Sequence, residues 1–282
     1  MSKVVLCLLA TVSAFRSPVI SRVPARLQGA ADVAEIKKAV LPADIGETSQ
    51  AILSWTGLAL GVGGLAKPAY VASKTLGIAT SGASNVLVRG ASLAALLLGA
   101  RLGRDGDRDA AKSALLWMGG WHYILRGSTG VAGRTATVCG LLALSAARRS
   151  GGLWNALTTL DTDGLSSILP RDRTASFQNI VGAQMMAWGF GLWFAPDFLV
   201  TNLMGRASVS STVVKGLAIN NLVLGGKVMA GSEDDAKTNG LLFFGGWAAI
   251  MLLAKNAGTM SGQYLLPCLA WNAACAAYTV VA

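Results

Sequence analysis

The amino-acid sequence predicts an all-α integral membrane protein with about eight transmembrane helices in two parallel four-helix repeats. Three observations predict this class. Hydrophobic residues make up 53% of the 282 residues and charged residues only 13%, whereas soluble domains carry roughly 25% charged residues. Eight apolar segments follow one another along the chain. The last four segments repeat the layout of the first four.

The first 30 residues have the composition of a targeting sequence. Lys3 precedes an apolar stretch at 4–12 that is too short to span a bilayer, so residues 1–14 are predicted to be a signal peptide. Residues 15–30 form a transit-peptide-like segment that contains Arg, Ser and Pro but no acidic residue.

The junction "VSAFRSP" places Phe15 directly after the predicted signal peptide. It resembles the bipartite plastid-targeting presequences of algae with red-type secondary plastids. This resemblance implies cleavage before Phe15 and import into a plastid membrane, either thylakoid or envelope. The alternative is an ordinary secretory leader, which would place the chain in a membrane of the secretory pathway.

The apolar segments define two membrane regions and a linker. The first four segments make up a four-helix repeat at 50–147, and the last four make up a second repeat at 179–282. Leucine and tryptophan at helical spacing predict a short interfacial helix in the linker, residues 148–178. The segments themselves run at about 50–66, 85–100, 111–126, 130–147, 179–195, 211–229, 238–254 and 262–281.

A shift of 126 residues, the separation of Arg89 from Lys215, aligns the two regions. It also pairs Arg101 with Lys227, and Gly119-Gly120-Trp121 with Gly245-Gly246-Trp247. These matches predict a tandem duplication. Because each unit has an even number of spans, both copies are expected to insert in the same orientation.

The second span of each repeat reads "RGASLAALLLGARL" (89–102) and "KGLAINNLVLGGKV" (215–228). With the preceding Pro-containing turn and the following acidic hairpin, this pattern resembles tandemly duplicated, uncharacterised DoxX-like four-helix membrane families. The resemblance implies a four-helix membrane unit, and those families have no uniform activity to carry over.

Arg89 and Lys215 are the candidate site residues because each lies a few residues inside the second span of its repeat. A cation inside a membrane span is costly, so it marks a functional site by default. The predicted site would bind an anion or a lipid headgroup between the two halves. The alternative is that both side chains extend to the nearer membrane surface.

Three further features have specific structural expectations. His122, the only histidine, could ligate haem or chlorophyll, but a hydrogen bond to a neighbouring helix is the simpler expectation. The glycines of "GVGGLA" (61–66), with Gly57, suit close helix packing. Asp109 and Asp235 are expected to cap the spans that follow them.

The sequence contains no nucleophile–base arrangement and no cluster of metal ligands, so no catalytic residue, metal or cofactor is predicted. The net charge of +10 is concentrated in the leader and loops, which argues against nucleic acid as a partner. The expected function is therefore a non-enzymatic scaffold or accessory of a membrane complex, with the lipid bilayer as its surroundings. The alternative is a carrier for a small anionic or lipidic solute.

Overall fold

The computed structural model describes residues 45–103, 107–149, 177–205 and 209–281, and all regular structure in these ranges is helical. The predicted all-α class is therefore confirmed. The predicted leader at 1–30 and the predicted interfacial helix of the linker lie outside these ranges.

The helices form two sets of five, each in the same order. The first helix set comprises α3 (Ile45–Ala66), α4 (Pro68–Leu76), α5 (Gly82–Leu102), α6 (Asp107–Leu125) and α7 (Gly130–Arg149). The second helix set comprises α10 (Phe177–Phe194), α11 (Pro196–Met204), α12 (Ser211–Met229), α13 (Glu233–Asn256) and α14 (Leu265–Val281). Each predicted apolar segment coincides with one of the eight longer helices.

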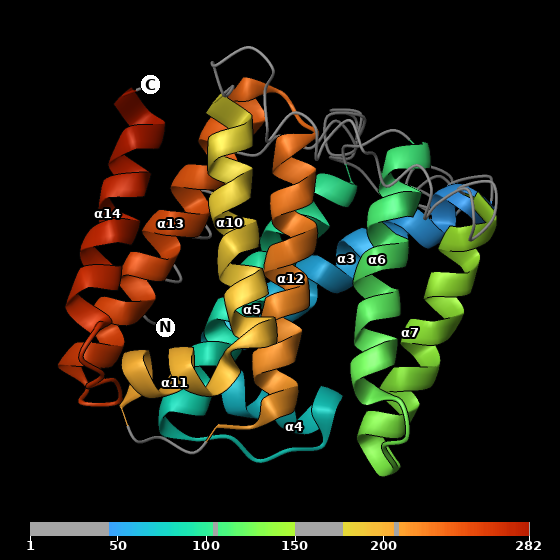
Figure 1. The fold of residues 1–282 in the computed structure, drawn as a ribbon. Coiled ribbons are helices and arrows are strands. Elements are labelled where there is room, and N and C mark those ends of the chain that lie inside the picture. Colours follow the sequence, from blue (N-terminus) through green and yellow to red (C-terminus); the bar gives the residue numbers. More distant parts are fainter. Residues whose placement is uncertain (1–44, 104–106, 150–176, 206–208, 282) are drawn as a thin grey trace, which may run out of the picture.

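Two short helices occupy places where the sequence suggested only a Pro-containing turn and a loop. The nine-residue helices α4 and α11 begin at Pro68 and Pro196. Proline suits the first position of a helix because its φ is already helical and no N–H is needed there. Both short helices lie across the same end of the bundle (Figure 1).

Glycines bring the first long helix of each set very close to the third helix of that set. A Cβ added at Gly57 of α3 would lie 2.6 Å from Gly99 Cα of α5, and one added at Gly61 would lie 2.5 Å from Leu96 Cβ. In the second set, a Cβ at Gly182 of α10 would lie 2.6 Å from the carbonyl oxygen of Gly225 on α12. The close packing predicted for Gly57 and the "GVGGLA" glycines is confirmed.

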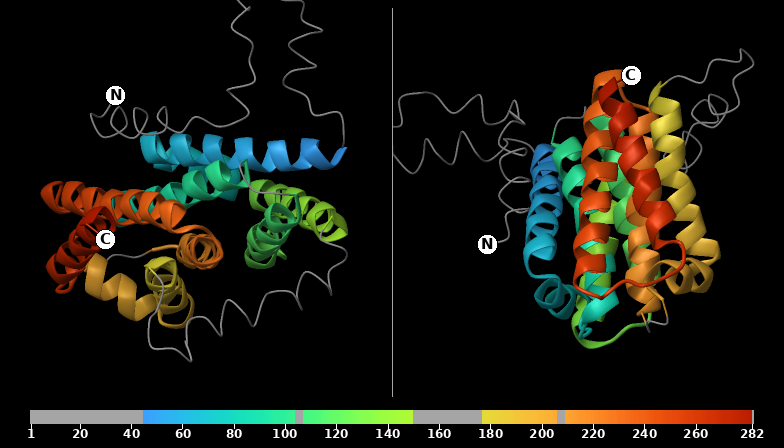
Figure 2. Two further views of the ribbon diagram at one scale, coloured as in Figure 1. Left: turned by 90° about the horizontal axis from the view of Figure 1, so that it is seen from above. Right: turned by 90° about the vertical axis from the view of Figure 1, so that its left-hand side faces the viewer.

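The remaining helices of each set form a hairpin that contacts helices of both sets. α6 and α7 pack together and α6 contacts α12, while α13 and α14 pack together and α13 contacts α5. Contacts between α5 and α6, and between α12 and α13, are slight. Figure 2 shows the two hairpins on opposite sides of the central pair α5 and α12.

The contacts of α6 with α12 and of α13 with α5 use residues that the 126-residue shift aligns. Trp121 of α6 lies over Gly216 of α12, and Trp247 of α13 lies over Gly90 of α5. Close by, Gly120 faces Ile219 and Gly246 faces Leu93, which are again aligned pairs.

Three of the described helices are long and apolar enough to cross a membrane, namely α5, α7 and α13. The apolar stretches Gln50–Ala66 and Leu265–Val281 are shorter. α5 is mostly enclosed by the other helices, whereas α7 is largely open to the outside. The predicted number of eight spans stays a prediction.

Candidate functional site

The two cations predicted to form an anion site are not enclosed. Near the start of α5 the Arg89 side chain is half-buried, and near the start of α12 the Lys215 side chain is exposed. The structure shows no hydrogen bond or ion pair between either side chain and another described residue. Polar groups of the interior instead gather farther along α12.

Asn220 is the centre of a hydrogen-bonded junction of three helices. Its Oδ1 accepts from Trp117 Nε1 at 2.9 Å and from Trp121 Nε1 at 3.0 Å, both on α6. Its Nδ2 donates to the backbone carbonyl of Ala91 on α5 at 2.8 Å. Because Asn220 and Trp117 are buried, these bonds join α5, α6 and α12 where water cannot replace them.

The adjacent asparagine, Asn221, faces a different environment. It lines a small cavity of about 20 Å³ bounded by α5, α12 and other helices of the second set. The rest of the wall is leucine, methionine and tryptophan, with Asn272 of α14 as the other polar residue. Asn221 Oδ1 is buried and has no hydrogen-bond partner, whereas Asn272 Nδ2 donates to the carbonyl of Cys268 at 2.8 Å.

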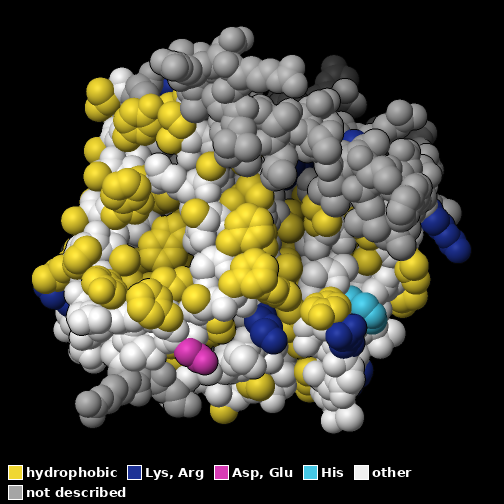
Figure 3. Space-filling view, in the orientation of Figure 1, with side chains coloured by type: hydrophobic (Ala, Val, Ile, Leu, Met, Phe, Trp, Pro, Cys, Tyr) yellow, Lys and Arg dark blue, Asp and Glu magenta, His cyan; other side chains and the backbone are white. Residues whose placement is uncertain are grey.

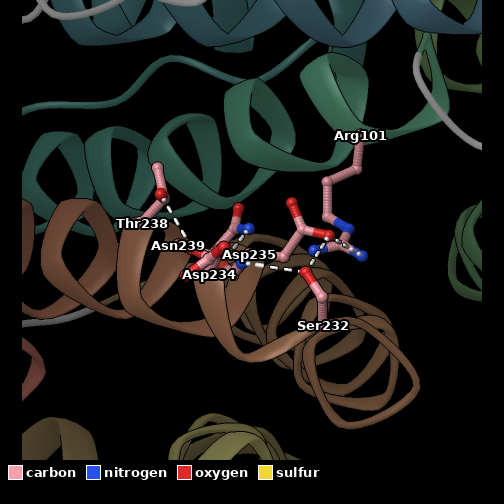
Figure 4. Close-up of polar contacts among 6 residues, drawn as sticks. All are labelled: Arg101, Ser232, Asp234, Asp235, Thr238 and Asn239. Atoms are coloured by element: carbon pink, nitrogen blue, oxygen red, sulfur yellow. Dashed lines mark hydrogen bonds and ion pairs between the residues drawn. The ribbon is translucent and has the colours of Figure 1, made fainter. Parts of the chain in front are cut away.

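A buried cation lies at the far end of α5. The Arg101 side chain is 6% exposed and its Nη2 lies 3.5 Å from Asp235 Oδ2, in the first turn of α13 (Figure 4). Arg101 Nε and Nη1 have no hydrogen-bond partner. Gly231 makes room for the guanidinium, since a Cβ there would lie 2.6 Å from Nη2. Lys227, which the 126-residue shift aligns with Arg101, is also buried.

The start of α13 corrects the predicted role of Asp235 as the helix cap. The cap is Ser232, whose Oγ accepts from the backbone N–H of Asp235 at 3.2 Å and donates to Asp235 Oδ2 at 3.0 Å. Serine at this position satisfies a backbone N–H that has no partner within the helix. The carboxylate of Asp235 lies beside Arg101 instead of capping the helix. The side chain of Asp109, for which the same role was predicted, lies outside the described residues.

His122 makes the predicted contact with a neighbouring helix. Its Nδ1 lies 2.8 Å from the backbone carbonyl of Ala136 on α7, so Nδ1 carries the proton in this bond. Gly140 allows the ring to approach, because a Cβ there would lie 2.9 Å from Nδ1. This bond links α6 to α7, which also pack together along the hairpin.

Sequence reasoning missed the residues that carry most of the interior polarity. Asn220 and Asn221 stand side by side in an otherwise apolar segment, and that isolation was a usable signal. The 126-residue shift aligns Arg101 with Lys227 near the ends of the second spans, but neither was predicted to be a site residue. The structure buries these two cations and leaves Lys215 exposed.

Comparison with protein families, with curated proteins and with solved structures finds no match to this chain. Within the described ranges, no group of three or more His, Cys, Asp or Glu side chains is placed to hold a metal ion. The polar residues described above are therefore interpreted from their own geometry.

Proposed function

We propose that the protein is a multi-pass membrane protein of a plastid that acts as a non-enzymatic scaffold or accessory of a membrane complex. Its two helix sets are copies of one unit of four long helices and one short helix, and both copies are inserted in the same orientation. The reciprocal contacts of Trp121 with Gly216 and of Trp247 with Gly90 support the duplication, as does the position of α4 and α11 at one end of the bundle.

The membrane location rests on one observation, the distribution of polarity between the inside and the outside of the bundle. On α7, Val138, Leu141 and Leu144 are exposed by 55%, 63% and 64%, and no charged residue lies between Arg134 and Arg148. Asparagines and Arg101 are buried instead. Soluble monomers rarely expose apolar patches of this kind, whereas lipid is a favourable surrounding for them.

α14, the last helix of the second set, also has an apolar outer surface. It contains no charged residue, and its large exposed side chains are all hydrophobic: Leu266, Trp271, Tyr278, Val280 and Val281. Hydrophobic side chains also cover much of the face in Figure 3, where the charged side chains in view lie mainly toward its lower part and edges. Such a surface suits lipid or the apolar surface of another membrane protein.

The placement of Arg89 and Lys215 supports a scaffold more than a carrier. A carrier for an anionic solute would enclose its cations around a polar path, but these two side chains are half-buried and exposed. The cavity beside Asn221 has no charged residue in its wall. Many tightly packed glycines on α3, α5, α10 and α12 suit a rigid body that partners can dock against.

Membrane integration is tested by alkaline carbonate extraction of membranes from cells that express the full chain. We expect the protein to stay in the pellet, and its release into the supernatant would contradict the proposal. The scaffold role is tested by native-gel separation of gently solubilised plastid membranes. Comigration with a membrane complex is expected, and migration as a free monomer would contradict the scaffold.

The plastid location rests on the leader and is tested separately. Residues 1–30 are fused to a fluorescent protein and expressed in an alga with a red-type secondary plastid. We expect import of the fusion, loss of import with Phe15→Ala and retention with Phe15→Trp, which keeps an aromatic ring. Secretion of the unchanged fusion would favour the secretory-pathway alternative.

A further inference from the structure

The cavity at α12 contains a buried hydrogen-bond acceptor, Asn221 Oδ1, that has no hydrogen-bond partner among the described residues. Asn221 is 1% exposed, and its Oδ1 has no partner. Native proteins leave very few buried polar groups without a partner. Since Asn221 also lines a cavity, the missing donor can come from a molecule that is not part of the chain.

The chemistry of the wall limits what that molecule can be. Residues such as Leu87, Leu217, Trp247 and Met251 present carbon to the cavity, and no lining residue is charged. A buried water molecule typically makes about three hydrogen bonds, and this wall offers few polar groups. A hydroxyl at the end of an apolar chain fits better, because it donates one bond while its carbon atoms contact the wall.

The size and surroundings of the cavity indicate how such a molecule would lie. A volume of about 20 Å³ accepts a hydroxyl end group but not a whole lipid. Of the lining residues, only Trp188 on α10 is partly exposed, so a bound chain is expected to leave the cavity beside it.

The site belongs to one half of the molecule. The 126-residue shift places Ala95 at the position of Asn221, so the first helix set has no equivalent acceptor. Methionines in the wall, such as Met204 and Met260, adjust easily to the shape of a flexible chain.

We propose that this cavity binds the hydroxyl end of an uncharged, single-chain lipid alcohol. Asn221 Oδ1 accepts the hydrogen bond from the hydroxyl group, and the hydrocarbon chain leaves beside Trp188 toward the outer surface of α10. The site rests on the proposed membrane location but not on the scaffold role or the plastid location, so its test can fail while those proposals stand.

The test uses the purified full chain in nanodiscs and a photoreactive twelve-carbon alcohol that carries a diazirine. We expect saturable labelling of peptides that contain Trp188 or Met251, located by mass spectrometry. In competition, 1-dodecanol should bind about tenfold more tightly than dodecyl methyl ether, which lacks the donor, because one hydrogen bond contributes about that factor. In Asn221→Leu the two competitors should bind equally.

Two further variants separate the site from a general effect on folding. Asn239→Leu changes another buried asparagine, whose Nδ2 donates to the Asp235 carbonyl and which does not line the cavity, so the tenfold preference should persist. Leu192→Trp fills the cavity and should abolish labelling while Asn221 is unchanged. Equal competition in the unaltered protein, or labelling that does not saturate, would overturn the proposal.

Discussion

The two tryptophan–glycine contacts between the helix sets are alike in shape and different in polarity. Trp121 lies over Gly216 and Trp247 lies over Gly90, at aligned positions. At the first contact, Asn220 accepts hydrogen bonds from Trp121 and from the neighbouring Trp117. At the second, Ala94 replaces that asparagine, and Trp247 borders the cavity where Asn221 Oδ1 has no partner.

This difference shows that one packing arrangement can serve two purposes. The shape of each contact depends on a tryptophan fitting over a glycine, and this is the same on both sides. The polarity depends on one dipeptide, Asn220-Asn221, which corresponds to Ala94-Ala95 in the first set. One contact is thereby joined by hydrogen bonds, and the other retains space beside an unpaired acceptor.

The largest effect is expected from Asn220→Leu. This change leaves two indole N–H groups without an acceptor, and that of Trp117 is deeply buried. We expect the free energy of unfolding to fall by about 3 kcal/mol, since each buried unpaired group costs about 1–3 kcal/mol. Denaturant titration in mixed micelles measures it.

The matched control for that change is Asn221→Leu. Its Oδ1 already lacks a partner, so the protein should be as stable as the unaltered chain or slightly more stable. Equal losses from the two substitutions would remove the distinction between the hydrogen-bonded contact and the contact beside the cavity.

The next largest loss of stability is expected when a methyl group is added beneath each tryptophan. A Cβ at Gly216 would lie 2.1 Å from the Trp121 ring, and one at Gly90 would lie 2.2 Å from the Trp247 ring. Overpacking of this kind costs about 1–3 kcal/mol. We expect about 2 kcal/mol for Gly216→Ala and about 1 kcal/mol for Gly90→Ala, because Trp121 is also held by Asn220.

The control for the glycine changes is Gly226→Ala, where a Cβ would meet no atom within 4 Å. Alanine favours a helix over glycine by up to about 1 kcal/mol, so this variant should be unchanged or more stable. Thermal unfolding monitored by circular dichroism compares the three variants. A larger loss from Gly90→Ala than from Gly216→Ala would contradict the predicted role of Asn220.

A smaller loss is expected from Asp235→Ala, which removes the acidic partner of the buried Arg101. Breaking a buried ion pair costs about 3–5 kcal/mol, but Asp235 is 34% exposed, so we expect roughly 1 kcal/mol. The double variant Arg101→Met, Asp235→Leu should recover this loss, because neither charge is then left without a partner. Urea titration of both variants in mixed micelles tests this, and a double variant less stable than Asp235→Ala would contradict it.

The exposed pair Glu233–Lys237, at 3.0 Å and one turn apart, is the comparison for that ion pair. Glu233→Ala should change stability by no more than about 0.5 kcal/mol.

The smallest effects are expected at the two cations that the sequence had favoured. Neither Arg89 nor Lys215 makes a hydrogen bond or ion pair with the described residues, and surface substitutions usually change stability by less than about 0.5 kcal/mol. Arg89→Ala and Lys215→Ala should therefore unfold like the unaltered protein and keep its migration on native gels. If either variant no longer comigrated with the membrane complex, that residue would again be a candidate for the functional site.

The positions of the long helices could be predicted from the sequence because each helix contains a continuous run of apolar residues. The segment 211–229 coincides with α12 to the residue, and the other segments differ from their helices by a few residues at one or both ends. The helices α4 and α11 were missed because a proline was interpreted as the start of a turn. In both places the proline is the first residue of a helix.

The partners of the helices could not be predicted from local patterns. The same apolar face of α6 would suit α5 or α12, and the match between the two halves makes those surfaces alike. Asn220 meets Trp117 across 103 residues of sequence, a separation that no helical spacing encodes. The buried polar groups were missed for the same reason, because their partners lie on distant helices.

The contact of each hairpin with the other helix set also determines the order in which the packing of the protein can form during synthesis. When α6 leaves the ribosome, the helix it packs against, Ser211–Met229, has not been made. At about 5–20 residues per second, roughly 5 to 20 s pass before that surface exists. During this interval the surface of α6 that contacts α12 has no partner. A chain that stops at the middle would therefore leave a half without a complete core, whereas two halves synthesised separately could still assemble with each other.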